Sequence, residues 1–331
     1  MPHISVITAC HNAEPYVNAA IHSVLAQSFE NFELIFVDDC STDKSLEAAT
    51  LLSKKDDRIR IFKTDRKSGA GAARNIAIEY ATGDWLAILD ADDIWLPNKL
   101  QMQVELIQTN NADLVLAGTG CYHIDKSGLR IGRYVYPTHS HALKRNLYSR
   151  KKFPPHSSMI YRTSAVRKIG GFNQRFPRSE DYDLWLRLSE VGKYVSCALP
   201  LIEYRLHSTN ISFQRSRYGF TQIEYGTAAR VCQMLRNAGL IDPSTGDDPD
   251  LWKTFMEHIA RVIHESGYQD YLVWKTEWKL SMQHTDNNFL KLLCSINTIT
   301  TSPSLFLTFL MEQMRGVGLA RKCFRSWIEL N

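Results

Sequence analysis

Three carboxylates stand directly after an apolar run in the first third of the chain. Asp90, Asp92 and Asp93 follow the segment Trp85–Leu89, with Ala91 between the first two. Carboxylates packed this closely repel one another, and a hard divalent cation would relieve that repulsion. Capping of the next helix by Asp93 would explain only one of the three. The spacing therefore predicts a metal site that shares its ion with phosphate oxygens.

Two further polar groups could complete a phosphate or nucleoside site. Asp39 ends a second apolar run, Phe32–Val37, and could accept hydrogen bonds from a base or ribose. Arg74 lies in a glycine-rich stretch that follows the third strand. A dinucleotide fingerprint belongs in the first strand-to-helix turn, so this position argues against one. We expect Arg74 to meet a diphosphate or to orient the aspartates, the alternative being an ordinary surface arginine.

Glu180 and Asp181 open an amphipathic stretch in the second half of the chain. The helix dipole favours acidic residues in a first turn, which is one explanation for the pair. A carboxylate at such a junction can also project into a cleft as a general base, and Asp181 is the candidate for that role. His207 stands alone and is either structural or a ligand of metal or phosphate.

The elements that must position these residues alternate along the chain. Apolar runs end at Ala9, Val37, Phe62 and Leu89, a further run covers Leu114–Ala117, and helical patterns lie between them at 16–25, 44–53, 69–80 and 97–108. This alternation predicts an α/β fold with a mainly parallel sheet flanked by helices. From about Phe213 the pattern becomes helical. We expect two domains, a ligand-binding one over 1–210 and a helical one over 211–331.

Taken together, these blocks resemble the inverting family 2 glycosyltransferases of the GT-A fold, of the bacterial polysaccharide type. The resemblance covers about residues 3–210, and no single block is specific. The order and spacing of the following blocks make the combination specific: Val6-Ile7-Thr8 with Asn12, Val37–Asp43, Gly71 with Ala73-Arg74-Asn75, Gly83–Asp93, Gly170–Phe172, Glu180–Trp185 and Tyr204–His207.

The resemblance implies a role for each residue and a UDP-linked donor, with dTDP and GDP as alternatives. The nucleoside is expected against Thr8, Ala9, His11, Asn12, Glu14 and Asp39, and the rest of the donor against Arg74, Asp90 and Ala91. Asp90, Asp92 and His207 would hold Mn²⁺ or Mg²⁺ on the diphosphate. Asp181 would be the catalytic base, with Glu180 as its competitor. The acceptor would be a hydroxyl of a glycan or lipid-linked glycan.

The charge distribution separates the two sides of this predicted site. The net charge is only +4, yet thirteen Lys and Arg and no Asp or Glu fall between Lys126 and Ser179. This segment could bind an anionic acceptor, lie on an anionic membrane, or be a solvated face. Nucleic acid is not expected, because no recognised module accompanies the charge. A basic amphipathic stretch, Arg315–Trp327, could lie at a membrane interface, pack on the main domain or contact a second subunit.

Cysteine usage and hydropathy indicate the compartment. Seven cysteines without a C-x-x-C pair argue against a disulfide framework or zinc ribbon and fit a reducing cytosol. The first residues lack the pattern of a signal peptide, and the longest apolar candidate, Leu292–Met311, is interrupted by polar residues and Pro303. We therefore expect a cytoplasmic protein, either free or peripheral on the inner face of the membrane.

Two other functions fit parts of the pattern. A nucleotidyltransferase would share the α/β core and acidic metal site, but it should carry a glycine-rich basic loop after the first strand, where this chain has Ala9–Asn12. A non-catalytic nucleotide-sugar binding module would not need Asp90, Asp92 and Asp181 together.

Overall fold

The computed structural model describes residues 3–110, 112–207, 220–266 and 318–330. The chain divides into two compact units, Met1–Gln222 and Ile223–Asn331. The predicted boundary at residue 210 lies within 208–219, outside the described residues. The first unit carries a sheet, and the second is helical in its described part.

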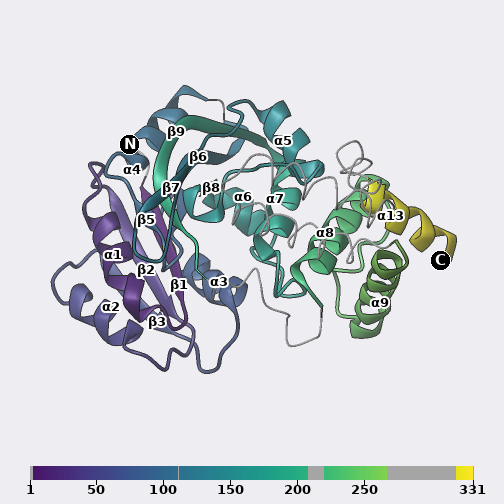
Figure 1. Cartoon of the computed structure of the whole chain (residues 1–331), viewed down its shortest axis with the longest axis horizontal. Helices are drawn as coiled ribbons and strands as arrows, with labels where there is room; N and C mark the ends of the chain where they lie inside the picture. The colour runs from purple at the N-terminus through teal and green to yellow at the C-terminus, as the bar shows by residue number, and fades with distance from the viewer. Residues whose placement is uncertain (1–2, 111, 208–219, 267–317, 331) are drawn as a thin grey trace, which may run out of the picture. The chain divides into compact units, whose positions relative to one another are not determined.

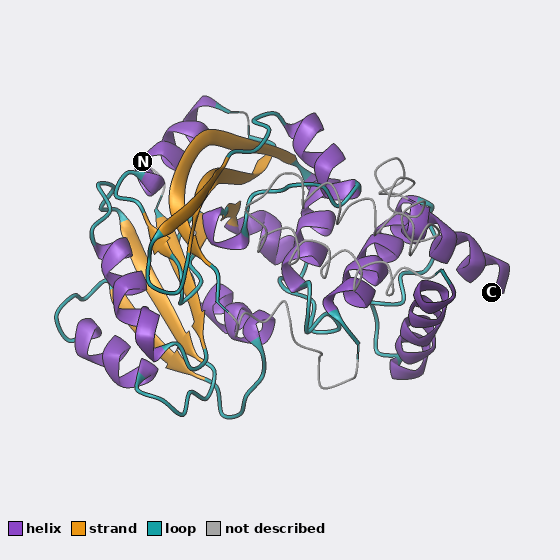
Figure 2. Cartoon of the chain, viewed as in Figure 1, coloured by secondary structure: helices purple, strands orange, loops and turns teal. Residues whose placement is uncertain are grey.

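A mixed sheet forms the centre of the first unit (Figure 2). Its nine strands in the described residues are β1 Ile4–Cys10, β2 Phe32–Asp38, β3 Ile59–Lys63, β4 Trp85–Ile88, β5 Ile94–Trp95, β6 Leu114–Ile124, β7 Arg130–Tyr134, β8 Ile160–Arg162 and β9 Lys193–Arg205. Their order is β3-β2-β1-β4-β8-β6-β9-β5, with β7 beside β6. Strands β3, β2, β1 and β4 are parallel, and β8 is antiparallel to both β4 and β6.

Helices cover both faces of the parallel strands (Figure 1). The helices of this unit are α1 Glu14–Leu25, α2 Ser45–Ser53, α3 Ala70–Tyr80, α4 Lys99–Thr109, α5 Ser140–Tyr148, the short 3₁₀ helix η1 His156–Ser158, α6 Thr163–Lys168 and α7 Glu180–Val191. Val6 and Leu34 face the core shared with α1 and α2, whereas α3 contacts β1 and β2 without joining that core. Because both faces are covered, β2 is buried along its whole length.

The structure confirms the α/β fold and the parallel first half. It also shows longer strands than the pattern predicted, since β6 continues from Leu114 to Ile124 instead of ending at Ala117. Strands β7, β8 and β9 were not predicted at all. Their sequences carry glycine, proline and charged residues, and β7 is exposed along much of its length, so no apolar run marks them.

The described part of the second unit contains α8 Gln222–Asn237, which starts at the unit boundary, α9 Pro249–Glu265 and α13 Gly318–Leu330. The predicted amphipathic stretch is described from Gly318 onward. Its Trp327 is buried and packs edge-on against Phe255 of α9, with ring centroids 5.0 Å apart. Cys323 and Trp327 of this helix are therefore packed inside the protein, whereas Ile328 and Leu330 are 42% and 62% exposed.

No helix in the described ranges is long and apolar enough to cross a membrane. The segment Leu292–Met311 lies outside them. None of the six cysteines that the structure describes forms a disulfide, in agreement with the cysteine pattern.

Candidate functional site

The predicted site residues gather where β1, β2 and β4 end, which is where ligands bind in open α/β sheets. The chain leaves β4 at Ile88 and reaches Asp90 two residues later. At this point the sheet also changes direction, because β4 pairs with parallel β1 on one side and antiparallel β8 on the other. Residues far apart in sequence therefore meet at this edge.

Arg74 joins the carboxylates of two distant segments. Its guanidinium donates to Asp90 Oδ1 at 2.8 Å and to Glu180 Oε1 at 3.0 Å, and its side chain is buried. Its carbon Cζ also lies 5.5 Å from the centre of the Phe172 ring. The alternative of a surface arginine is wrong: Arg74 connects the end of β4 to the start of α7.

The carboxylates after β4 are electrostatically crowded, as their spacing predicted. Burial raises the pKa of Asp90, Arg74 opposes that change, and the neighbouring Asp92 raises the pKa further. Burial and the two other aspartates raise the pKa of Asp93 well above its usual range. Asp93 accepts a hydrogen bond from the backbone N–H of Arg205 at 2.8 Å, and α4 begins only at Lys99, so Asp93 does not cap that helix.

Asp92 and His207 meet although 115 residues separate them. His207 Nε2 lies 2.9 Å from Asp92 Oδ2. Two ligands of one small divalent ion, about 2.1 Å from it and at right angles, would be about 3 Å apart, so this pair fits a shared ion. No group of three His, Cys, Asp or Glu side chains able to hold a metal occurs in the described ranges. An ion here would need oxygens from a ligand such as a diphosphate, which is common for Mg²⁺.

Two residues that received no role from the sequence hold this pair in place. The Arg205 side chain donates through Nε to the carbonyl oxygen of Asp92 at 2.8 Å. Tyr16 contacts both Arg205 and His207: the Arg205 guanidinium is 4.7 Å from the centre of its ring, and the His207 imidazole stacks on it at 5.4 Å. Arg205 was visible in the Tyr204–His207 block, but nothing in the sequence linked it to Asp92.

Glu180 and Asp181 differ sharply in environment. Glu180 is ion-paired with Arg74. Among the described residues no cation pairs with Asp181, whose Oδ1 accepts the backbone N–H of Tyr182 at 2.7 Å. Burial raises the pKa of Asp181 to about 7, and the adjacent charge of Glu180 adds to the effect.

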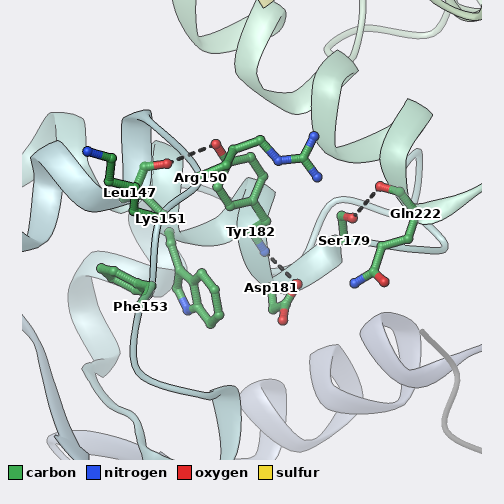
Figure 3. A pocket seen from close by; sticks show the side chains of 9 residues that line it. Leu147, Arg150, Lys151, Phe153, Ser179, Asp181, Tyr182 and Gln222 are labelled. Carbon is green, nitrogen blue, oxygen red and sulfur yellow. Dashed lines mark hydrogen bonds between the residues drawn. The ribbon is translucent and has the colours of Figure 1, made fainter. Parts of the chain in front are cut away.

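Asp181 lines a pocket of about 250 Å³ at the start of α7 (Figure 3). Ser179, which precedes this helix, has a left-handed backbone with φ +58°, and its hydroxyl donates to the carbonyl of Gln222 at 3.0 Å. The lining is part aromatic and part basic: Leu147, Arg150, Lys151, Phe153, Ser179, Asp181, Tyr182, Trp185 and Gln222. A carboxyl group that ionises near neutral pH therefore faces a cavity large enough for a small polar ligand.

Three of the residues predicted to wrap a nucleoside, His11, Asn12 and Glu14, bond to the loop that follows β2. Asn12, with φ +54°, accepts from the N–H of Thr42, and Glu14 N–H donates to Asp43. His11 Nδ1 lies 2.8 Å from the carbonyl of Asp39. Ala9 is partly exposed, whereas Ala91 is buried. The hydroxyl of Thr8 is buried without a hydrogen-bond partner.

The carboxylate of Asp39 is fully engaged with the protein. It accepts hydrogen bonds from Thr64 Oγ1, from the N–H and hydroxyl of Ser68, and from the N–H of Gly69. Burial opposes ionisation, yet these donors hold the pKa of Asp39 below its usual range. Gly69 has φ +94°, a conformation that suits glycine, and precedes α3. Asp39 thus orders the loop leading to Arg74, and its contact with a base or ribose stays a prediction.

The chain resembles known proteins in sequence and in fold. A sequence model described as Glycosyl transferase family 2 matches residues 5–170. The Escherichia coli protein named UDP-Glc:alpha-D-GlcNAc-diphosphoundecaprenol beta-1,3-glucosyltransferase WfgD is 33% identical over 216 residues, which cover 63% of this chain and 79% of WfgD.

Solved structures share the fold at low sequence identity. S. aureus TarS 1-349 in complex with UDP-GlcNAc superimposes with a TM-score of 0.61 at 16% identity, covering 99% of this chain and 92% of that one. The match spans 42% of a longer TarS chain. The mannosyltransferase PcManGT from Pyrobaculum calidifontis, in complex with GDP-Man and Mn²⁺, gives a TM-score of 0.54 at 13% identity over 98% of this chain and 87% of that one.

Proposed function

Because this chain belongs to glycosyltransferase family 2 and has a GT-A-like fold, we propose that it is an inverting enzyme that uses a nucleotide diphosphate sugar. UDP is the proposed nucleotide, since WfgD is named for UDP-Glc and TarS was solved with UDP-GlcNAc. The proposed acceptor is a hydroxyl of a glycan or of a lipid-linked glycan, the latter being the kind of acceptor in the name of WfgD.

One observation supports this proposal most directly: two adjacent carboxylates have different surroundings. Glu180 is held by Arg74, whereas Asp181 faces the pocket with a pKa of about 7. A general base works best when its pKa lies near the working pH. We therefore assign the base to Asp181 and a positioning role to Glu180.

The proposed step is a single displacement. Asp181 takes the proton of the acceptor hydroxyl while that oxygen bonds to the anomeric carbon of the donor sugar. The bond from that carbon to the diphosphate oxygen breaks, and its electron pair leaves with the diphosphate. Attack opposite to the leaving group inverts the anomeric configuration, so an α-linked donor gives a β-linked product.

Asp92 and His207 would hold Mn²⁺ or Mg²⁺, with Asp90 beside them. A bound ion supplies charge neutralisation for the departing diphosphate. The chain itself offers Arg74 as a fixed cation next to Asp90. The first 125 residues contain 10 basic and 18 acidic residues, and an acidic site of this kind binds a diphosphate poorly without a cation.

We also propose that the chain meets its acceptor at an anionic membrane surface, through strand β7 and the residues on either side of it. The residues Leu129, Ile131 and Val135 are 65%, 55% and 45% exposed, and exposed Arg133 lies between the last two. This strand lies in the segment 126–179, which has thirteen basic and no acidic residues. Exposed aliphatic side chains beside basic ones suit the interface of an anionic bilayer. Pairing of this edge with β7 of a second copy is disfavoured, because the basic side chains of the two strands would lie opposite one another.

Flotation with liposomes tests this surface. We expect the protein to float with vesicles that contain anionic lipid and to be released by high salt, because each basic residue contributes about 1 kcal/mol near such a surface. The variant Ile131→Asn should float less, whereas Leu51→Asn, at a leucine on α2 that is 53% exposed, should not differ. Binding that is equal for neutral vesicles, or unaffected by Ile131→Asn, would contradict the assignment.

A panel of nucleotide sugars tests the proposed activity. Thermal shift with Mn²⁺ should show stabilisation by the true donor, since a ligand of the folded state raises the midpoint by mass action. A donor-hydrolysis assay should then release the nucleoside diphosphate. Binding without turnover would favour a non-catalytic module, and release of pyrophosphate would favour a nucleotidyltransferase.

A further inference from the structure

The proposed base shares its pocket with two cationic side chains that the reaction itself does not use. Asp181, Arg150 and Lys151 all line the cavity of about 250 Å³ (Figure 3). Ligand pockets usually range from about 300 to 1,000 Å³, so this hollow has room for about one saccharide unit, and the rest of an acceptor would lie outside it. A group that contacts Arg150 is therefore close to the hydroxyl that Asp181 would deprotonate.

The backbone conformation of Arg150 is one that residues other than glycine rarely adopt. It follows α5 in a left-handed conformation, with φ +50°. The N–H of Lys151 donates to the carbonyl of Asn146 at 2.8 Å, and the N–H of Arg150 donates to that of Leu147 at 3.1 Å. These two bonds form a Schellman motif, in which the left-handed residue is usually glycine. A strained backbone of this kind points to a functional side chain.

The surroundings of Arg150 suit an anion attached to a sugar. Its carbon Cζ lies 5.6 Å from the centre of the Tyr182 ring. Phe153 and Trp185 supply aromatic faces in the same pocket, with ring centroids 5.0 Å apart. A planar guanidinium binds phosphate or carboxylate through paired hydrogen bonds.

We propose that Arg150 binds an anionic group of the acceptor within one saccharide unit of the accepting hydroxyl. This inference rests on the proposed function, because it takes the pocket of Asp181 as the acceptor side. The anionic group is either a phosphate on the sugar or the carboxylate of a uronic acid. Both present oxyanions to the same guanidinium.

Three small probes with the same ring test the proposal: methyl glucoside, glucose 1-phosphate and methyl glucuronide. Binding is measured by calorimetry to the full chain saturated with UDP and Mn²⁺, which blocks the donor side. We expect one of the two anionic probes to bind at least tenfold more tightly than methyl glucoside, since a hydrogen bond to a charged group corresponds to about 10–100-fold in affinity. Preference for the phosphate identifies a phosphorylated acceptor, and preference for the glucuronide identifies an acidic sugar.

The variant Arg150→Gly separates binding from folding. Glycine is the usual residue at this position, so the melting temperature should not fall, while the preference for the anionic probe should disappear. Arg145→Ala changes an exposed arginine of the same helix outside the pocket and should leave the preference intact. Undetectable or equal binding of the three probes, or a preference that survives Arg150→Gly, would overturn the proposal. UDP binding by both variants reports separately on the donor site and hence on the proposed function.

Discussion

Replacing Asp181 with Asn should reduce sugar transfer by about 10²–10⁴-fold, the usual contribution of a general base. The amide has nearly the same shape and can still accept the N–H of Tyr182, so donor binding should be unchanged. Transfer by the unchanged protein should fall as the pH drops below about 7, because protonated Asp181 cannot accept a proton. The residual activity of the Asp181→Asn variant should not show this fall at acid pH.

The stability of the folded protein should fall as the pH rises, whereas its activity should increase. Since the folded pKa of about 7 lies above the ordinary value of 3.8, the folded state holds its proton more tightly than the unfolded state. Ionisation of Asp181 therefore lowers the stability of the native protein as pH rises from about 4 to 7. Asp181→Asn should melt at a higher temperature than the unchanged protein at pH 8, and the difference should shrink near pH 4. A damaged fold would show the reverse.

The variant Glu180→Gln decides between the two carboxylates. It should weaken the contact with Arg74 and lower activity less than Asp181→Asn does. If Asp181→Asn turned over normally while Glu180→Gln did not, the base would be Glu180.

Removing the divalent ion or its proposed ligands should abolish tight binding of UDP. Asp92→Ala and His207→Ala each remove one of two donor atoms that lie 2.9 Å apart. Loss of an outer-shell partner typically lowers the affinity of a metal site by roughly 10–100-fold. Loss of a direct ligand should cost at least as much, so the gain in UDP affinity that Mn²⁺ provides should fall by at least this factor. Calorimetry with UDP, in the presence of Mn²⁺ or of EDTA, measures this without requiring turnover.

Asp57→Ala is the matched control, because this exposed aspartate belongs to the same acidic half of the chain but lies away from the site. It should keep the full Mn²⁺ effect. UDP affinity that is equal with Mn²⁺ and EDTA would show that Arg74 and the backbone suffice, and would contradict the metal assignment.

The sequence predicted the parallel half of the sheet because its strands are apolar on both faces. β1 and β2 are nearly continuous runs of buried residues, and such runs are visible without a structure. The antiparallel half could not be predicted in the same way. β9 begins with Lys193, includes Pro200 and is partly exposed, so its long pairing with β6 depends on tertiary contacts that the sequence pattern does not carry.

The predicted site divides along similar lines. Residue type and position after a strand indicated Asp90 and Asp92, whereas Asp181 was indicated by its place at the start of a helix and by the family resemblance. Their partners could not be read from one sequence: Arg205 supports Asp92 through a backbone carbonyl, and Arg150 reaches the pocket from a helix that was not predicted. For Asp39 the sequence pattern suggested only a ligand contact. The structure gives it a structural role, because it accepts four hydrogen bonds from the loop before α3.

The change of strand direction beside β4 also has a consequence for folding. Arg74 meets Glu180 across 106 residues, and His207 meets Asp92 across 115. Contacts of such long sequence separation form only after the entropy of closing large loops has been overcome. The parallel half, β1 to β4, relies on nearer neighbours and can form while later segments are still being synthesised. We therefore expect a growing chain to acquire the parallel strands first and to stay inactive until α7 has packed against the sheet and the end of β9 has paired with β6.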